Sequence, residues 1–248
     1  MPLRENATST SRRAVVARLA SVILAVVPAL GSAQGDAIPS FKTLDSIEAR
    51  VQGCVTCHGQ SGQGTSNGYF PRIAGKPAGY LYNQLIAFRD GTREYPPMNY
   101  LVAYLPDAYL REMAEHFANQ RPALPEPTVP KISKQALERA EALITKGDTA
   151  KGIPACTACH GKALTGMQPA MPGLVGLPAY YVSAQLGAWR NGVRHANEPD
   201  CMGKVASRLS DDEVAWLGVW LAWQRASADA APAPARKTKL PLDCGDLK

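Results

Sequence analysis

A short cysteine and histidine motif occurs twice in this chain and constrains its fold more than any other feature. The sequence CVTCH occupies residues 54–58, and CTACH occupies residues 156–160. On a helical turn, this spacing places both sulfurs and the imidazole on one face. Each copy therefore indicates a site at which two sulfurs and one imidazole act together.

The repeat extends beyond the motif. Residues 70–93 align with residues 171–194, and 11 of the 24 aligned positions are identical. The repeated unit is about 90 residues long and occurs only twice, which is typical of a duplicated domain and too few copies for a solenoid.

The composition between and after the two copies predicts the domain boundaries. Residues 121–133 contain four prolines, so we expect a linker there and neither a helix nor a central strand. Apolar residues within each copy follow a helical period. We predict an all-α fold of two tandem domains, residues 38–120 and 134–225, followed by an Ala/Pro-rich tail, residues 226–248.

Two local signals mark helix ends. Gly91 and Gly192 follow apolar helical patterns at matching positions, where a glycine commonly terminates a helix. Ser210 and Glu213 have the spacing of a capping box, which predicts that a helix begins after Ser210.

The N-terminus resembles an export signal. A basic segment precedes twelve residues that are predominantly apolar, 19–30, and small residues follow at 31–33. Twelve helical residues span about 18 Å, well short of a hydrocarbon core of about 30 Å. We therefore predict a signal peptide over residues 1–33 that is cleaved near Ala33, and a periplasmic mature protein.

Removing this segment weakens the charge argument for nucleic-acid binding. The chain has a formal net charge of +6, and the first 33 residues, with four arginines and one glutamate, carry half of it. The mature part is then only weakly basic, so no nucleic-acid partner is expected.

The repeated motif predicts covalently bound haem. Two cysteines three residues apart can form thioether bonds to the haem vinyl groups, and the next residue, His58 or His160, reaches the iron. The predicted attachment sites are Cys54, Cys57, Cys156 and Cys159. A zinc site is the alternative, but it needs four ligands per ion or both motifs at one ion. A thioredoxin-like redox pair is excluded because no βαβ pattern surrounds either motif.

A second axial ligand must come from elsewhere. The two histidines outside the motifs, His116 and His195, have no histidine at the matching position of the other copy. Met98 and Met202 do form a matched pair, each seven residues before the leucine that precedes the last helix. We predict that they ligate the irons, which raises the reduction potential relative to two imidazoles. The unmatched Met113, Met167 and Met171 are expected to be packing residues.

Together with one shared block of sequence, these motifs resemble the cytochrome c4 family of tandem class I c-type cytochromes over residues 40–225. The block is P-x-x-x-G-x-P-x-x-Y-x-x-x-Q-L-x-x-(F/W)-R-x-G-x-R. The resemblance implies two haem c groups, and it implies that the carbonyls of Pro71 and Pro172 orient the two histidines. It also suggests that a further set of side chains lies near haem edges or propionates: Tyr80, Tyr181, Arg89, Arg93, Arg190 and Arg194. The arginines could instead lie at solvated helix ends. Lys76 and Leu177 depart from the family, which often has glutamine there.

Two cysteines remain outside the motifs. In an exported protein, Cys201 and Cys244 are expected to form a disulfide that attaches the tail to the loop carrying Met202. The alternative is that the Cys201 thiolate ligates iron in place of Met202.

The resemblance implies a di-haem electron carrier, and the sequence shows no acid–base cluster beyond the haem ligands. The expected partners are a quinol-oxidising complex, a terminal oxidase or a dehydrogenase, and peripheral association with a membrane is compatible with these. The alternative function is the cytochrome subunit of a periplasmic dehydrogenase, or a di-haem enzyme like thiosulfate dehydrogenase.

Overall fold

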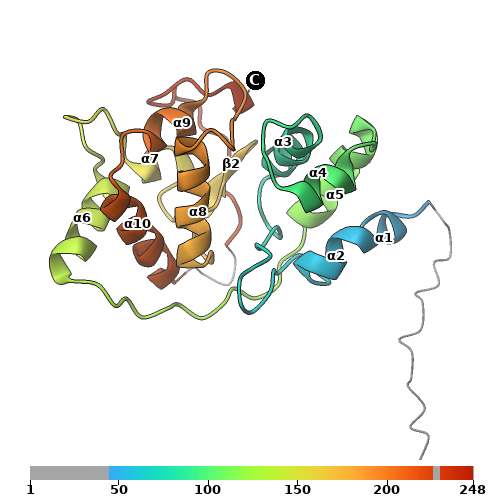
Figure 1. Ribbon diagram of the computed structural model, residues 1–248, viewed down its shortest axis with the longest axis horizontal. Helices are drawn as coiled ribbons and strands as arrows, with labels where there is room; N and C mark the ends of the chain where they lie inside the picture. The colour runs from blue at the N-terminus through green and yellow to red at the C-terminus, as the bar shows by residue number, and fades with distance from the viewer. Residues whose placement is uncertain (1–44, 226–229, 248) are drawn as a thin grey trace, which may run out of the picture. The chain divides into compact units, whose positions relative to one another are not determined.

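Each half of the chain folds into its own set of helices around its own apolar core (Figure 1). The computed structural model describes residues 45–225 and 230–247. The predicted signal peptide, residues 1–33, lies outside these residues. Within the described ranges, no helix has the length and apolar character needed to cross a membrane.

The first half is built on the packing of its third helix against its fifth. Its helices are α1 (Ile47–Arg50), α2 (Gln52–His58), α3 (Ala78–Arg89), α4 (Pro96–Val102) and α5 (Asp107–Ala118). The buried side chains of its core include Leu81, Phe88, Val102, Leu110 and Phe117. Met113 is also buried there, as predicted for a packing methionine.

The second half repeats this order of helices. Its elements are α6 (Lys134–Thr145), α7 (Cys156–His160), β1 (Gly166–Met167), β2 (Met171–Pro172), α8 (Ala179–Arg190), α9 (Cys201–Ala206) and α10 (Asp211–Trp223). The packing of α8 against α10 matches that of α3 against α5. The predicted all-α fold of two tandem domains is confirmed, and both halves belong to one compact unit of the chain.

Local backbone signals explain where the two matching helices end. Gly91 and Gly192, just after α3 and α8, have φ angles of 80° and 72°, a left-handed conformation that glycine adopts without steric penalty. The two-residue strands β1 and β2 were not predicted. They pair through Met167 and Met171, and strands this short cannot produce a recognisable alternating pattern.

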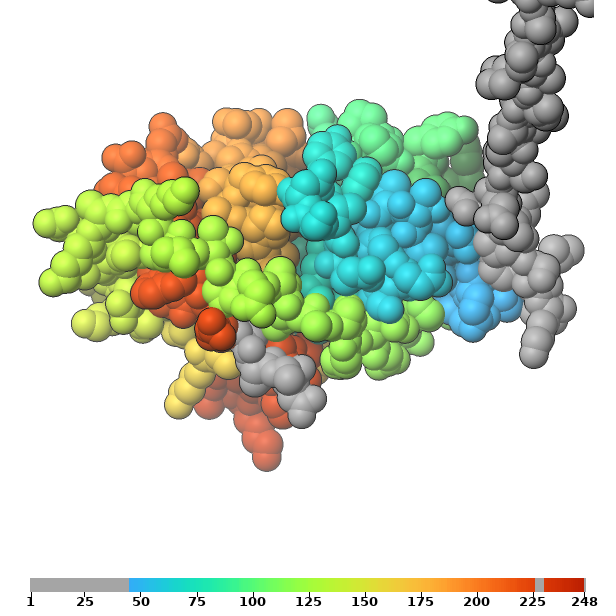
Figure 2. Space-filling view, turned by 90° about the horizontal axis from the view of Figure 1, so that it is seen from below, coloured from blue at the N-terminus to red at the C-terminus, as the bar shows by residue number. Residues whose placement is uncertain are grey.

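The predicted linker has no helix or strand, and much of its length is exposed, as the light-green atoms in Figure 2 show. The described part of the tail returns to the second half. Ala233 exchanges backbone hydrogen bonds with Gly166 and Gln168, and a short 3-10 helix, η1 (Gly245–Leu247), ends the described chain.

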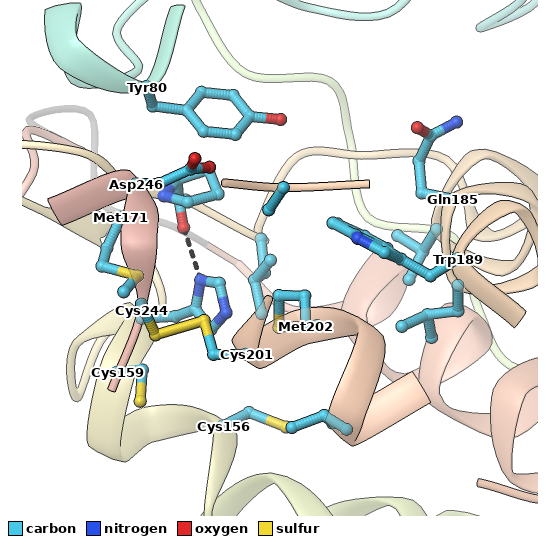
Figure 3. A pocket seen from close by; sticks show the side chains of 18 of the residues that line it. Tyr80, Cys156, Cys159, Met171, Gln185, Trp189, Cys201, Met202, Cys244 and Asp246 are labelled. Carbon is cyan, nitrogen blue, oxygen red and sulfur yellow. Dashed lines mark hydrogen bonds between the residues drawn. A yellow bond between two sulfur atoms is a disulfide. The ribbon is translucent and has the colours of Figure 1, made fainter. Parts of the chain in front are cut away.

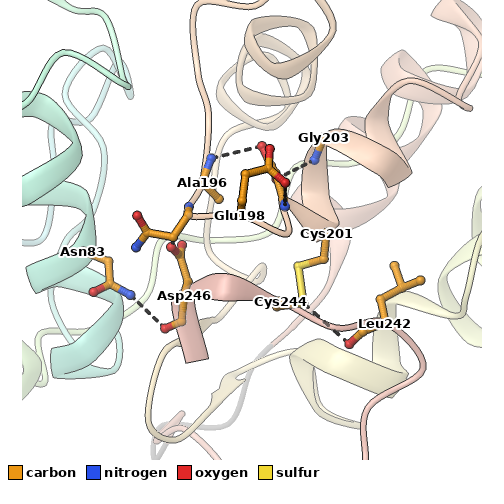
Figure 4. Close-up of a disulfide and its surroundings, with 10 residues drawn as sticks. Asn83, Ala196, Glu198, Cys201, Gly203, Leu242, Cys244 and Asp246 are labelled. Atoms are coloured by element: carbon orange, nitrogen blue, oxygen red, sulfur yellow. Dashed lines mark hydrogen bonds between the residues drawn. A yellow bond between two sulfur atoms is a disulfide. The ribbon is translucent and has the colours of Figure 1, made fainter. Parts of the chain in front are cut away.

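A disulfide joins this tail to the start of α9 (Figure 4). It links Cys201 to Cys244, whose Cα atoms are 5.1 Å apart. Next to it, the Asp246 carbonyl accepts a hydrogen bond from Asn83 Nδ2 of α3 at 2.9 Å. The end of the tail therefore contacts both halves of the chain.

An ion-pair cluster attaches α6 to the start of α10. Ser210 and Glu213 form the predicted capping box, and the buried Glu213 carboxylate also accepts from Arg139 and Lys151. Burial by itself would raise the pKa of Glu213, but hydrogen bonds from Lys151, the Ser210 amide and Arg139 outweigh it and lower the pKa to about 2. The ionised carboxylate thus stabilises the fold.

Glu213→Gln should lower the free energy of unfolding by about 2 kcal/mol at pH 7, because charged hydrogen bonds are lost. Since the folded-state pKa is depressed, this contribution is fully present above the ordinary value of 4.5 and is lost as the pH falls toward about 2. Denaturant unfolding at pH 7 and pH 4 measures it. Asp212→Asn, an exposed change in the same helical turn, is the control, and an equal effect of both variants would contradict this account.

Cys201→Ser combined with Cys244→Ser should destabilise the protein by about 4 kcal/mol, because the bridge closes a separation of 43 residues. Thermal unfolding of the mature protein measures the loss. Thiol titration of the unfolded, unreduced wild type should find no free thiol, and a reactive thiol would contradict the bridge.

Candidate functional site

The first cysteine–histidine motif forms helix α2 and ends at a buried histidine. His58 Nδ1 donates a hydrogen bond to the Pro71 carbonyl oxygen over 2.8 Å. This contact fixes the proton on Nδ1, so Nε2 keeps its lone pair for a metal. Cys54 and Cys57 precede the histidine on the same short helix.

The second motif repeats this geometry on α7. His160 Nδ1 donates to the Pro172 carbonyl, also over 2.8 Å. Burial lowers the pKa of both motif histidines, which favours the neutral imidazole that binds a metal. Two independent copies of one histidine–proline contact thus present an Nε2 atom in each half.

Burial affects the first thiol of each motif. It raises the pKa of Cys54 to about 11 and that of Cys156 to about 12, so both are protonated as free thiols. Nowhere in the described ranges do three or more His, Cys, Asp or Glu side chains gather as a metal cluster. The arrangement therefore favours haem over a zinc site with four protein ligands.

A pocket in the second half contains the motif and the predicted methionine together. Cys156, Cys159, His160 and Met202 all line it (Figure 3). The other walls are mainly apolar and come largely from α8, α9 and α10: Leu174, Leu177, Val182, Leu186, Val205, Leu209, Leu217 and Leu221. This is the environment that a flat, mostly apolar ring such as haem requires.

The matched methionines occupy equivalent short helices. Met98 lies in α4 and is half-buried against the first core. Met202 lies in α9 against the second core. Met171 also lines the pocket, but it is buried in a separate apolar cluster with Met167 and the tail.

The polar end of this pocket has buried cations that no carboxylate of the described residues pairs with, and one donor without an acceptor. The buried indole N–H of Trp189 has no hydrogen-bond partner among the described residues. Lys76 and Arg194 are also buried at the pocket, and neither forms an ion pair with a carboxylate in the described part of the chain. This donor set suits an anionic group, and the two carboxylates of haem have the chemistry that fits.

A hydrogen-bond network of paired residues joins the two halves. Arg93 donates to Gln84 at 2.9 Å and to Gln185 at 2.7 Å. Arg194 repeats the pattern, donating to Gln185 at 2.6 Å and to Gln84 at 2.8 Å. The two arginines also form an antiparallel β-bridge.

The tyrosines of the repeat belong to the same network. Arg93 contacts the Tyr181 hydroxyl at 3.4 Å, and Arg194 contacts the Tyr80 hydroxyl at 3.3 Å. Each contact crosses from one half to the other, so the repeat positions build one approximately two-fold joint. Tyr80 reaches the pocket of the second half, as Figure 3 shows.

The other two arginines of the repeat, Arg89 and Arg190, form ion pairs outside this network. Arg89 bonds to Asp107 at 2.6 Å, and Arg190 bonds to Asp211 at 2.5 Å. These aspartates begin α5 and α10, where a carboxylate is stabilised by the helix dipole. Arg89 and Arg190 thus connect the ends of α3 and α8 to the starts of α5 and α10, and their expected place near the haem edges stays a prediction.

The structure leaves no thiolate at Cys201, because its sulfur is bonded to Cys244. Sequence reasoning missed Lys76, Trp189 and Asp246 as residues that line the pocket. It also missed the role of Gln84 and Gln185, although both are among the identical positions of the repeat. The identity of uncharged polar residues between the two copies was the signal that could have found them.

Comparison with known proteins gives close relatives over most of the chain. A thiosulfate dehydrogenase electron acceptor of Thiomonas intermedia is 36% identical over 69% of this chain and 78% of its own length. A cytochrome c4 of Pseudomonas aeruginosa is 32% identical over 82% of this chain and 96% of its own length. No protein-family profile matches the chain.

Solved structures agree with these relatives. Reduced recombinant cytochrome c4 from Pseudomonas stutzeri is 27% identical, with a TM-score of 0.60 over 74% of this chain and 99% of that one. The thiosulfate dehydrogenase TsdBA of Marichromatium purpuratum, in its as-isolated form, is 32% identical, with a TM-score of 0.61 over 68% of this chain and 36% of that one.

The relatives are named as cytochromes and electron acceptors, which agrees with two tandem sites that each present an imidazole beside a pair of cysteines. The protein exchanges electrons with redox partners and carries two covalently bound haem c groups. The chain belongs to the cytochrome c4 family of di-haem electron carriers.

Proposed function

We propose that this protein accepts electrons from a thiosulfate-oxidising dehydrogenase in the periplasm and delivers them to a terminal oxidase. Relatives with 36% and 41% identity are named electron acceptors of thiosulfate dehydrogenase. A quinol-oxidising complex is the alternative donor. Export would use residues 1–33, with cleavage near Ala33.

We further propose the residues that hold each haem. In the first half, Cys54 and Cys57 form the thioether bonds, and His58 and Met98 are the axial ligands. The proline carbonyl behind His58 holds the imidazole in place, and burial of Met98 against the core limits its movement. The bound iron supplies one-electron chemistry between its ferric and ferrous states.

The second half has the same arrangement, with Cys156 and Cys159 as attachment sites and His160 and Met202 as axial ligands. The observation that carries the proposed function is that His160 and Met202 line one pocket. With His160 and Met202 both holding the iron, the site would have no open position for a substrate. This supports a carrier and argues against the enzyme alternative.

Met202→Leu should abolish the sulfur-to-iron charge-transfer band of the second haem, because leucine fills the space without a thioether. Met98→Leu should do the same for the first haem. Because each haem has one methionine ligand, each variant should retain about half of the wild-type band intensity. Met171→Leu is the matched control, since Met171 lines the pocket within the tail cluster. An unchanged band in Met98→Leu or Met202→Leu would remove that methionine from the ligand set.

Stopped-flow mixing tests the partner. Thiosulfate with a purified thiosulfate dehydrogenase should reduce both haems of this protein, whereas thiosulfate alone should not. Rapid reduction by thiosulfate alone would favour the enzyme alternative. If thiosulfate and the dehydrogenase do not reduce a sample of this protein that dithionite reduces fully, this donor is rejected.

A further inference from the structure

A lysine of the first half lies inside the haem pocket of the second half. Lys76 is only 9% exposed, and its Nζ donates to the Gly173 carbonyl oxygen at 3.0 Å. It also lines the pocket that contains His160 and Met202. The first half thus contributes a cation to a site whose proposed ligands all come from the second half.

This contribution has no counterpart in the other direction. Lys76 lies between Gly75 and Pro77, and the matching segment, Gly176 to Pro178, has Leu177 in its place. Leu177 is packed in the apolar core of the second half. The two halves therefore differ at this position, where the first half has a positive charge and the second half has an apolar side chain.

Among the residues that the structure describes, no neighbouring carboxylate balances the charge of Lys76. The charged side chains that act on it are Arg72, Arg93 and Arg194, with the Tyr80 hydroxyl also nearby. Burial lowers the pKa of Lys76, and the three arginines act in the same direction, so a nearby anion is needed to keep the ammonium group charged.

Asp246 also lines the pocket, but it acts on Arg194 and not on Lys76. Its carboxylate accepts a hydrogen bond from the Asn197 backbone N–H at 3.0 Å, and the nearby Arg194 charge acts to lower its pKa. The carboxylates of haem therefore remain as the anions able to offset Lys76.

The backbone that Lys76 contacts also orients the predicted iron ligand. Gly173 directly follows Pro172, whose carbonyl accepts the Nδ1 proton of His160. A cation beside this segment attracts electron density away from the imidazole and repels added positive charge at the iron. Both effects destabilise the ferric state relative to the ferrous state, so they act in the same direction on the reduction potential.

We propose that Lys76 is a positioning residue of the second haem site that makes the second haem easier to reduce than the first. An electron that enters at the first haem then moves to the second: the first iron is oxidised from ferrous to ferric, and the second is reduced from ferric to ferrous. The lysine thus gives a direction to electron transfer between two halves that share one fold.

Spectroelectrochemical titration of the loaded protein tests this assignment. The two one-electron steps are assigned with Met202→His, because a second imidazole lowers the potential of the second haem. In Lys76→Gln, the equilibrium constant for reduction of the second haem should fall by about tenfold, which lowers its potential by about 59 mV for one electron. The potential of the first haem should not change. Lys76→Arg keeps the charge, so the equilibrium constant of its second step should stay within about threefold of the wild-type constant. On the scale of potentials, this is roughly half of the shift expected for Lys76→Gln.

Lys146→Gln is the matched control, because it removes an exposed lysine from the second half. Haem content and the charge-transfer band show whether each variant is intact, and Lys76→Met replaces Lys76→Gln if the latter does not fold. The proposal is overturned if removing the Lys76 charge leaves both potentials unchanged or shifts both equally. It is also overturned if Lys76→Arg lowers the potential of the second haem as much as Lys76→Gln does. These measurements need no thiosulfate dehydrogenase, so their failure is separate from failure of the proposed partner.

Discussion

The hydrogen bond from a buried imidazole to a proline carbonyl is the contact on which each site depends. His58 and Pro71 form it in one half, and His160 and Pro172 form it in the other, at the same distance of 2.8 Å. It leaves Nε2 free to bind iron and fixes the plane of the ring. The cysteines share a short helix with each histidine, so the same contact also sets where the thioether bonds can form.

The joint between the halves carries positive charge that the described polypeptide does not neutralise. Arg93 and Arg194 bond to glutamines and tyrosines, and Lys76 bonds to a backbone carbonyl. These are neutral acceptors, and burying cations among them alone is unfavourable. The acidic groups of two haems would complete the joint, which links cofactor binding to the association of the two halves.

The sequence predicted what depends on repetition and local pattern. The two helical domains and the capping box at Ser210 follow from spacing alone, and the structure contains them. It could not predict contacts between segments distant in the chain, such as Lys76 with Gly173 or Asn83 with Asp246. It also failed to separate Arg93 from Arg89, because both recur in the repeat and only the folded chain shows which of them reaches the other half.

Intact-mass measurement of the exported protein tests most directly whether each half holds its own haem. The mature wild type should exceed the mass of its polypeptide by two haem groups. A Cys54→Ala and Cys57→Ala double variant should exceed its polypeptide mass by one, since the second pocket keeps its own attachment sites. A wild-type protein that carries one haem or none, with correspondingly weak Soret absorbance, would contradict the account.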